Sequence, residues 1–355
     1  MAFTTIDKSS SYFKPKAFTG NGSAGNAITG VGFQPDWVWF KNRATTNSHS
    51  IFDSVRGTTK NIVSNTSAAE STNSNGLTAF GTDGFTVGSD ADVNGNGNGM
   101  ISWNWKAGTT GSGNTTGSGT AKTYNYSVST TSRFSIIKYV GNGSAGQTIP
   151  HHLGVVPKMI IVKPLDAADN WRVYHHNMNY SSTDGEDYHM QFNSTGGKTD
   201  SANYWNDTAP TSTVFTLGSD SGVGANDQEF IAYCFGEVIG YSKFGVYIGN
   251  GGSNSRQVYT GFKPSFVMVK RTEDTGNSWR MFDSERNGFN GKNGNLHANL
   301  NNAEDAPSDD FIDFYSNGFR PRTTSTDQNA SGGTYIYWAF GQTLVGSNNI
   351  PVTAR

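Results

Sequence analysis

Short apolar runs, separated by turn-forming residues, recur in the same order three times along the chain. Each copy begins with an aromatic strand that ends in Gly-Asn-Gly, at 20–22, 141–143 and 249–251. A proline follows 15 or 16 residues after the first glycine, and a lysine stands six residues after that proline. Self-similarity of this kind predicts a structural unit that is repeated.

The runs between proline and lysine are apolar at every position, which predicts strands covered on both faces. They occupy 37–40, 159–162 and 266–269. In the strand that follows in the second and third copies, Trp171 and Val173, and then Trp279 and Met281, alternate with polar residues. This alternation predicts that these side chains share one buried face. Each copy closes on an aromatic strand, and these strands lie at 101–105, 231–235 and 336–340.

The composition favours strands over helices. The chain has 44 glycines among 355 residues, and aromatic residues make up 13%. Turn formers are abundant, and the apolar content comes from residues that fit pleated sheets. The sequence therefore predicts an all-β protein of three tandem modules, each resembling a β-sandwich or jelly roll.

The predicted boundaries follow the repeats. An N-terminal arm covers 1–16, the first module 17–106, the second 124–237, and the third 238–355 with a C-terminal tail. Between the first two modules, 107–123 is rich in Gly, Thr and Ser and predicts a flexible linker, so that these two would be separate beads. Only 238–243 separates the second and third modules, so we expect those two to pack rigidly against each other.

Charge and targeting signals narrow the classes of function. The net charge is −2 and the isoelectric point is near 6.4, so we expect no nucleic-acid partner. No apolar run reaches membrane-spanning length, so we expect no membrane insertion. No secretion signal is visible, so we expect the protein to be made in a cytoplasm. The lone Cys234 lies inside an apolar run and predicts a small buried side chain.

Two acid–base pairs recur at matching places. Asp53 with Arg56, and Asp283 with Arg286, are each three residues apart, and we interpret them as ion pairs that stabilise a turn. The second copy has Tyr174 and His175 at this place, which argues against a shared catalytic role.

Candidate metal ligands are weak, and we predict neither a metal nor another cofactor. Asp90, Asp92 and Asn94 alternate as in a calcium loop, but the completing glutamate is missing, so a hairpin loop between two strands is favoured. The second copy holds a set of histidines without supporting carboxylates or cysteines, and we interpret them as exposed loop residues: His151, His152, His175, His176 and His189.

The candidates for ligand recognition lie in the aromatic and amide-rich loops of the second copy. Aromatic faces stack on sugar rings while amide and carboxylate groups bind hydroxyls, so these loops predict a glycan or receptor site, with ordinary solvated loops as the equal alternative. The candidate residues are Tyr180, Tyr188, Tyr204, Trp205, Asn206 and Asp207.

The whole pattern resembles repeat modules in virion proteins of tailed bacteriophages, especially marine ones, often labelled tail fibre or structural protein. The resemblance rests on Gly-Asn-Gly, then Gly-Phe-x-Pro-x-aromatic-Val with its lysine, then Phe-Asp-Ser-x-Arg, and on the opening Phe-Thr-Thr-Ile-Asp-Lys-Ser-Ser-Ser-Tyr-Phe. It implies a non-enzymatic virion protein, assembled in the host cytoplasm, that contacts other tail or capsid proteins and forms a homo-oligomer, with a trimer as one option.

Within that class we expect a tail fibre or adhesin that attaches to the host surface, with a capsid decoration protein as the alternative. A different class stays open. A virion-associated polysaccharide-degrading enzyme would need two carboxylates facing one cleft, and Asp184, Glu186 and Asp187 form the densest acidic cluster. A free carbohydrate-binding lectin is the third hypothesis.

Overall fold

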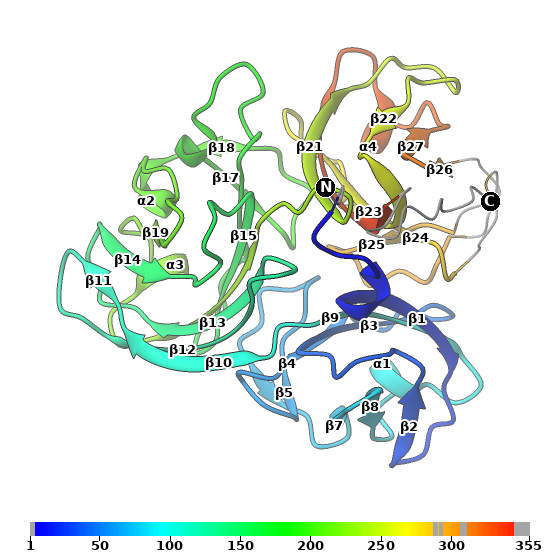
Figure 1. Cartoon of the computed structure of the whole chain (residues 1–355), viewed down its shortest axis with the longest axis horizontal. Coiled ribbons are helices and arrows are strands. Elements are labelled where there is room, and N and C mark those ends of the chain that lie inside the picture. The colour runs from blue at the N-terminus through cyan, green and yellow to red at the C-terminus, as the bar shows by residue number, and fades with distance from the viewer. Residues whose placement is uncertain (1–3, 287–289, 291–293, 306–310, 344–355) are drawn as a thin grey trace.

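The secondary structure of the chain is predominantly β-strand, as the composition predicts. The computed structural model describes residues 4–286, 290, 294–305 and 311–343. The three repeats form three lobes around a common centre (Figure 1). The few α-helices in the described residues are single turns.

Each repeat builds a larger and a smaller antiparallel sheet, and we give the strands of each sheet in their hydrogen-bonded order. In the first repeat the larger sheet is β1 (Phe13–Thr19), β9 (Gly99–Trp105), β3 (Trp37–Asn42) and β4 (Ser50–Asp53). The smaller sheet is β2 (Asn26–Thr29), β8 (Gly84–Val87) and β7 (Leu77–Gly81). The remaining elements are η1 (Ser9–Ser11), the pair β5 (Lys60–Asn61) and β6 (Ser71–Thr72), and α1 (Ala91–Asn94).

The second repeat has the widest sheet. Its strands are β10 (Thr109–Asn114), β12 (Thr123–Ser129), β13 (Phe134–Val140), β20 (Glu229–Phe235), β15 (Met159–Pro164), β16 (Arg172–His175), β17 (Tyr188–Gln191) and β18 (Thr199–Asp200). The smaller sheet is β11 (Thr116–Gly117), β14 (Gln147–Pro150) and β19 (Val214–Thr216). The helices are η2 (Gly185–Asp187), α2 (Ala202–Trp205) and α3 (Ser221–Gly224).

The third repeat returns to the simpler plan. Its larger sheet is β21 (Ser242–Ile248), β28 (Thr334–Thr343), β23 (Phe262–Arg271), β24 (Arg280–Asp283) and β25 (Leu296–His297). The smaller sheet is β22 (Val258–Tyr259), β27 (Gly318–Pro321) and β26 (Ile312–Tyr315), and α4 is Thr326–Asn329. In all three repeats the opening strand pairs with the closing strand, which pairs with the strand after the proline.

The central strands are buried on both faces, which confirms the prediction from their apolar runs. Every residue of β3 and β15 is buried. Side chains that point to the centre of the molecule join one apolar cluster drawn from all three repeats, including Trp37, Trp171 and Trp338. Side chains on the opposite face join a separate cluster in each repeat, together with residues of the smaller sheet.

The shared centre means that the repeats are not separate beads. Trp37 of the first repeat lies 4.5 Å, ring to ring, from Tyr233 of the second and 6.2 Å from Trp338 of the third. The same backbone hydrogen bond also closes each junction: Glu70 N–H donates to Leu165 O (2.9 Å), Lys198 N–H to Thr272 O (2.6 Å), and Glu304 N–H to Arg43 O (2.8 Å). The first repeat thus contacts the second, the second the third, and the third the first, in a closed ring.

The prediction of a flexible linker at 107–123 is wrong. This segment contributes β10 and β11 and leads into β12, which pairs along the edge of β13. A Gly/Thr/Ser-rich sequence is free to adopt many conformations, but here backbone pairing to an existing sheet supplies the order that its side chains lack.

The predicted N-terminal arm is also corrected in part. Residues 13–16 belong to β1, and Ile6 is buried in the central cluster. The backbone N–H and the hydroxyl of Ser9 both donate to the side-chain oxygen of Gln342, at 2.9 and 2.8 Å. The described part of the arm therefore packs onto the third repeat.

The Gly-Asn-Gly segments are turns, as predicted, and their geometry explains both glycines. In each copy the asparagine oxygen accepts the N–H two residues on, at 2.9 to 3.0 Å (Asn21, Asn142 and Asn250). The second glycine has a positive φ of 66 to 73°. A Cβ on the first glycine would lie only 2.2 to 2.3 Å from a backbone oxygen that follows the one-turn helix of the same repeat. Glycine is therefore needed where the turn meets that helix.

Candidate functional site

The two acid–base pairs are buried between repeats. Arg56 donates to Asp53 at 2.5 Å and Arg286 to Asp283 at 2.6 Å, and the backbone N–H groups of the following turn bond to the same carboxylates. This confirms the predicted turn-stabilising ion pairs. Each carboxylate also accepts a bond from the next repeat in the ring: Asp53 from the hydroxyl of Tyr233 (2.8 Å), and Asp283 from the indole N–H of Trp103 (3.0 Å).

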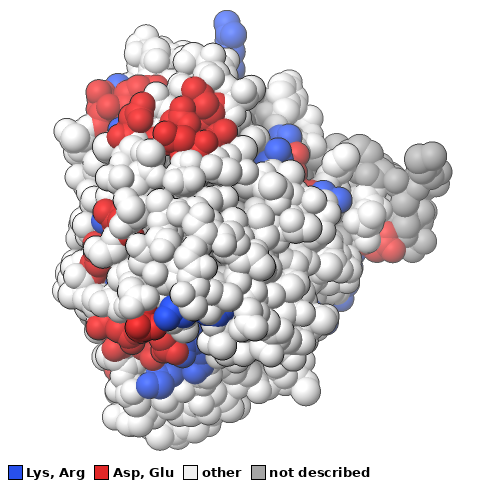
Figure 2. Space-filling model, turned by 90° about the vertical axis from the view of Figure 1, so that its left-hand side faces the viewer, with Lys and Arg blue, Asp and Glu red and all other residues white. Residues whose placement is uncertain are grey.

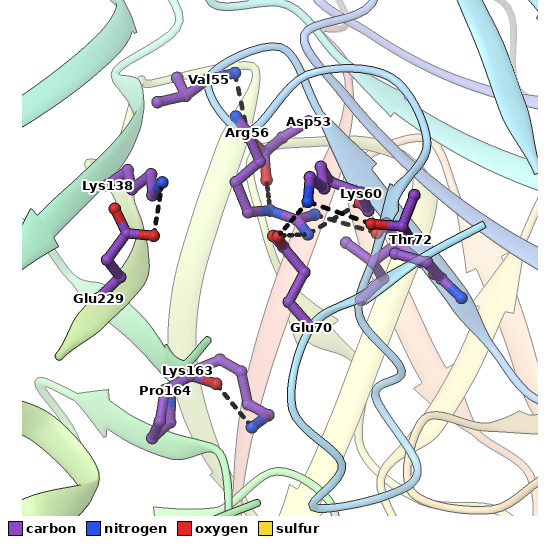
Figure 3. A network of polar contacts seen from close by, with 12 residues as sticks. Asp53, Val55, Arg56, Lys60, Glu70, Thr72, Lys138, Lys163, Pro164 and Glu229 are labelled. Carbon is purple, nitrogen blue, oxygen red and sulfur yellow. Dashed lines mark hydrogen bonds and ion pairs between the residues drawn. The ribbon is translucent and has the colours of Figure 1, made fainter. Parts of the chain in front are cut away.

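A second carboxylate completes each pair, as Figure 3 shows for the first repeat. Arg56 also contacts Glu70 at 3.2 Å, and Arg286 contacts Glu304 at 2.9 Å. Burial is the largest single effect on Arg56 and opposes its charge, but Asp53, Tyr233 and Glu70 together outweigh it, so the pKa of Arg56 is raised. Burial and the nearby Asp53 raise the pKa of Tyr233 well above its ordinary value. Arg56 therefore stays charged and Tyr233 stays neutral, which suits an interface rather than proton transfer.

The junction between the second and third repeats is built differently. In each repeat one residue pairs with the first apolar residue of the buried strand: Asp53, His175 and Asp283. The second repeat therefore has His175 in place of the aspartate, and Met178, three residues on, in place of the arginine. Burial lowers the pKa of His175 well below its ordinary value. The indole N–H of Trp338 finds no acceptor among the described residues, and a cavity of about 10 Å³ lies beside it.

A pair of substitutions tests this difference. We expect His175→Asp alone to destabilise the protein, because it buries a carboxylate without a cation. Adding Met178→Arg should recover part of that loss, with a coupling energy of about 1–3 kcal/mol, because the new ion pair could also accept the indole N–H of Trp338. Urea denaturation of the single and double variants measures the coupling. Additive effects would contradict the correspondence of positions 175 and 178 with the aspartate and arginine positions of the other two repeats.

One ionisable residue does recur in all three repeats. Lys41, Lys163 and Lys270 follow the buried strand and are fully buried. Each ammonium donates to backbone carbonyls, with shortest distances of 2.7 to 2.8 Å. Lys163 and Lys270 also reach carbonyls of the preceding repeat, at Ser67 and Thr195 (both 3.3 Å). The recurring lysine thus stabilises the loop that follows its strand and, in two repeats, also the contact with the preceding repeat.

These lysines predict a stability change at alkaline pH. Burial lowers the pKa of each to about 8, against 10.5 for the free side chain. Between these values the unfolded chain binds more protons than the folded one, so their contribution to stability is lowest below pH 8 and rises towards pH 10.5. We expect the loss in stability caused by Lys163→Met to be larger at pH 10 than at pH 8 in urea denaturation, and an equal loss at both would contradict the lowered pKa.

The weak calcium candidates make separate contacts. Asp90 caps α1, and the run lies on this one-turn helix, not on the hairpin loop that we predicted. Asp92 accepts the side-chain N–H of Asn47 at 2.6 Å, and the buried Asn94 bonds to the first Gly-Asn-Gly turn. Within the described ranges no group of three or more His, Cys, Asp or Glu side chains is arranged to hold a metal ion.

The interpretation of the histidines as exposed loop residues is wrong. His151, His175 and His189 are buried, and His152 and His176 are half-buried. Burial is the largest cause that lowers the pKa of all five, to about 4 for His151 and His189. Imidazole carries enough apolar surface to fill gaps between strands, and the sequence spacing gave no sign of this.

The predicted glycan residues gather on the outer loops of the second repeat, with one exception. Tyr188 lies on β17, and the ring of Tyr204 on α2 packs against that of His189, with ring centres 3.6 Å apart and an angle of 34° between the ring planes. Asn206 and Asp207 follow α2. Tyr180 lies in the loop between β16 and η2 and is 56% exposed. Trp205 is wrong as a contact residue: it is 2% exposed and packs on Tyr174 inside the repeat's own cluster.

Acidic side chains surround this surface, and Figure 2 shows them gathered on the upper part of the face that the second repeat presents. Partial loss of hydration and the neighbouring Asp207, Asp184 and Asp200 raise the pKa of Asp187. Lys198 lies over the ring of Tyr188 at 4.8 Å, and Arg172 over Tyr204 at 4.8 Å. We call Tyr180, Tyr188, Tyr204, Asn206, Asp207 and the acidic residues Asp184, Asp187 and Asp200 the tyrosine–acid surface.

Residues 8–343 match the family described as "Domain of unknown function (DUF7483)". The chain belongs to the DUF7483 family. The match covers all three repeats together, in agreement with the shared core of this DUF7483 chain. No curated protein and no solved structure matches it. Among the described residues no helix is long and apolar enough to cross a membrane.

Proposed function

We propose that the protein is a structural component of a bacteriophage virion, exposed on the particle as a tail-fibre or adhesin-type part that attaches to the host surface. In this proposal the three repeats are sandwich-like modules, each with a larger and a smaller sheet, fused into one rigid ring. The observation that carries it is the location of the recurring polar side chains. The buried ion pairs and lysines recur at the junctions and hold the scaffold, while the aromatic and acidic loops vary between repeats.

The tyrosine–acid surface is the proposed attachment site. Tyr180 is exposed and offers a flat ring face for a sugar, while Tyr188 and Tyr204 are half-buried at the edge of the surface. The carboxylates can accept hydrogen bonds from sugar hydroxyls. Because several carboxylates lie together, the ligand expected is a neutral or amino-bearing glycan rather than an anionic one. Other virion proteins and further copies of the chain are the proposed partners of the remaining surface.

Particle-level experiments test the role. Immunogold labelling should mark the tail, and deletion of the gene should reduce adsorption of particles to host cells. Label on the head would favour the alternative of a capsid decoration protein. Purified protein that does not associate with virions, together with a deletion that leaves assembly and adsorption unchanged, would overturn the proposal.

Substitutions on the surface test the site. Tyr188→Ala and Asp207→Ala should each weaken binding to host surface glycan by about tenfold, roughly the loss of one well-formed contact. The matched control is Ile239→Ala, since Ile239 is 66% exposed and lies outside the tyrosine–acid surface. Glycan binding that all three variants retain equally would place the site elsewhere.

A further inference from the structure

The opening strands β1, β13 and β21 occupy the same position in their sheets, but their outer edges are treated differently. In the third repeat β21 is an edge strand. The N–H of Phe244 donates to Glu237 at 3.4 Å, and the ring nitrogen of His176 lies 2.8 Å from the oxygen of Phe244. The polar backbone of Phe244 therefore faces away from β28. Since strand geometry repeats every two residues, that of Val246 and Ile248 faces outward too.

The second repeat covers this edge with its own chain. β12 pairs with β13, with Asn125 opposite Lys138, and β11 pairs with the neighbouring β14. The side-chain amide of Asn142 adds bonds to Ser118 O (2.8 Å) and Thr120 O (3.0 Å). The inserted segment 107–129 thus fills the space between the opening strand and the smaller sheet.

In the first repeat a proline and two lysines protect the same edge. Pro15 in β1 stands at the position of Phe244 and has no N–H to offer. Lys14 and Lys16 flank it, and the ammonium of Lys14 donates to Gly30 O at 2.6 Å. Proline and lysine on an edge strand are devices that prevent pairing with another chain.

In the third repeat, the part of β21 that follows Phe244 has neither a covering strand among the described residues nor an edge proline. Within the part of the chain that the structure describes, no hydrogen bond reaches the outward backbone groups of Val246 or Ile248. Beside them lies an open groove of about 360 Å³ between β21 and β22. Its walls include Ile248, 45% exposed, and Tyr259, 68% exposed.

The groove also carries an unmatched charge. Arg256 lines it and is exposed, and no carboxylate pairs with its guanidinium among the described residues. A chain lying in the groove would therefore gain by placing an aspartate or glutamate there.

We propose that β21 binds an extended, acidic strand of a partner protein by β-sheet addition. The partner strand pairs with the outward backbone of Val246 and Ile248 as β12 pairs with β13 in the second repeat. Its side chains lie on Tyr259 and Ile248, and its carboxylate bonds to Arg256. Backbone pairing supplies the affinity and these side-chain contacts the selectivity. The inference is independent of the proposed role in a virion, because it rests on the sheet edge alone.

A labelled peptide with the sequence of β12, Thr-Tyr-Asn-Tyr-Ser-Val-Ser, and an aspartate at each end is the probe. We expect saturable binding in fluorescence anisotropy and slower amide hydrogen exchange in 242–248. The same peptide with lysines at its ends should bind about tenfold more weakly, and Arg256→Glu should reverse this preference. Absence of saturable binding, or protection of 13–19 instead, would overturn the proposal.

Proline substitution tests the backbone pairing. Val246→Pro removes an outward N–H without breaking a bond to β28, and should weaken peptide binding at least about tenfold. The matched control is Ala17→Pro, the same position in β1, which should leave binding unchanged. Tyr259→Ala, at an exposed side chain, gives a second variant that does not depend on the strand tolerating proline. Unchanged binding by both Val246→Pro and Tyr259→Ala would refute the site.

Discussion

Replacing Arg56 with methionine is expected to lower the free energy of unfolding by about 3–5 kcal/mol, the usual effect of breaking a buried ion pair by removing one partner. The carboxylate of Asp53 is completely buried and would remain beside Tyr233 without its cation. Arg286→Met should have a similar effect, because Asp283 is held in the same way. Chemical denaturation followed by circular dichroism measures both.

The matched control is a pair of the same charges at the surface. Lys243 contacts Glu237 at 2.9 Å but both side chains are partly exposed, so Lys243→Ala should cost less than about 1 kcal/mol. The double variant Asp53→Asn with Arg56→Met should be less damaging than Arg56→Met alone, because no unpaired charge is left. Equal effects of Arg56→Met and Lys243→Ala would show that the buried pair does not hold the junction.

The second large effect is expected at the centre of the ring. Trp37→Ala should destabilise the protein by about 3–5 kcal/mol through lost burial and the cavity left behind. Its indole contacts rings of all three repeats: Trp105 at 4.3 Å, Tyr233 at 4.5 Å and Trp338 at 6.2 Å. We therefore expect one unfolding transition for the whole chain, at a lower midpoint in the variant.

Tryptophan fluorescence and far-ultraviolet circular dichroism should report the same midpoint, and hydrogen exchange should show the three repeats opening together. Tyr259→Ala removes an exposed aromatic side chain and should leave the midpoint unchanged. Separate transitions for separate repeats would mean that the modules are stable on their own, which the sequence led us to expect only of the first.

Much of the local structure could be predicted because it depends on neighbours in the sequence. The apolar run at 159–162 indicates a buried strand whatever lies next to it, and β15 is buried throughout. Cys234 is buried, as its apolar surroundings predicted. The pairing of Asp53 with Arg56 followed from their spacing, since residues three apart at a turn lie within reach of each other.

The candidate sites were predicted less well, because exposure is decided by distant parts of the chain. Trp205 and Asp207 are two residues apart, yet the first is buried against Tyr174 while the second is exposed. The groove beside β21 had no signal in its own sequence. It is recognised only by comparison with β13, where the inserted segment fills the same space.

By itself the sequence determined the strands, the Gly-Asn-Gly turns and their threefold recurrence, because period-two burial and the positive φ of Gly22, Gly143 and Gly251 are local properties of the chain. The tertiary structure alone decided that the repeats close into a ring. Asp53 meets Tyr233, and Trp103 meets Asp283, each across 180 residues of sequence. Contacts at that separation depend on how whole sheets pack, and this packing also turned a predicted linker into strands and left one sheet edge open.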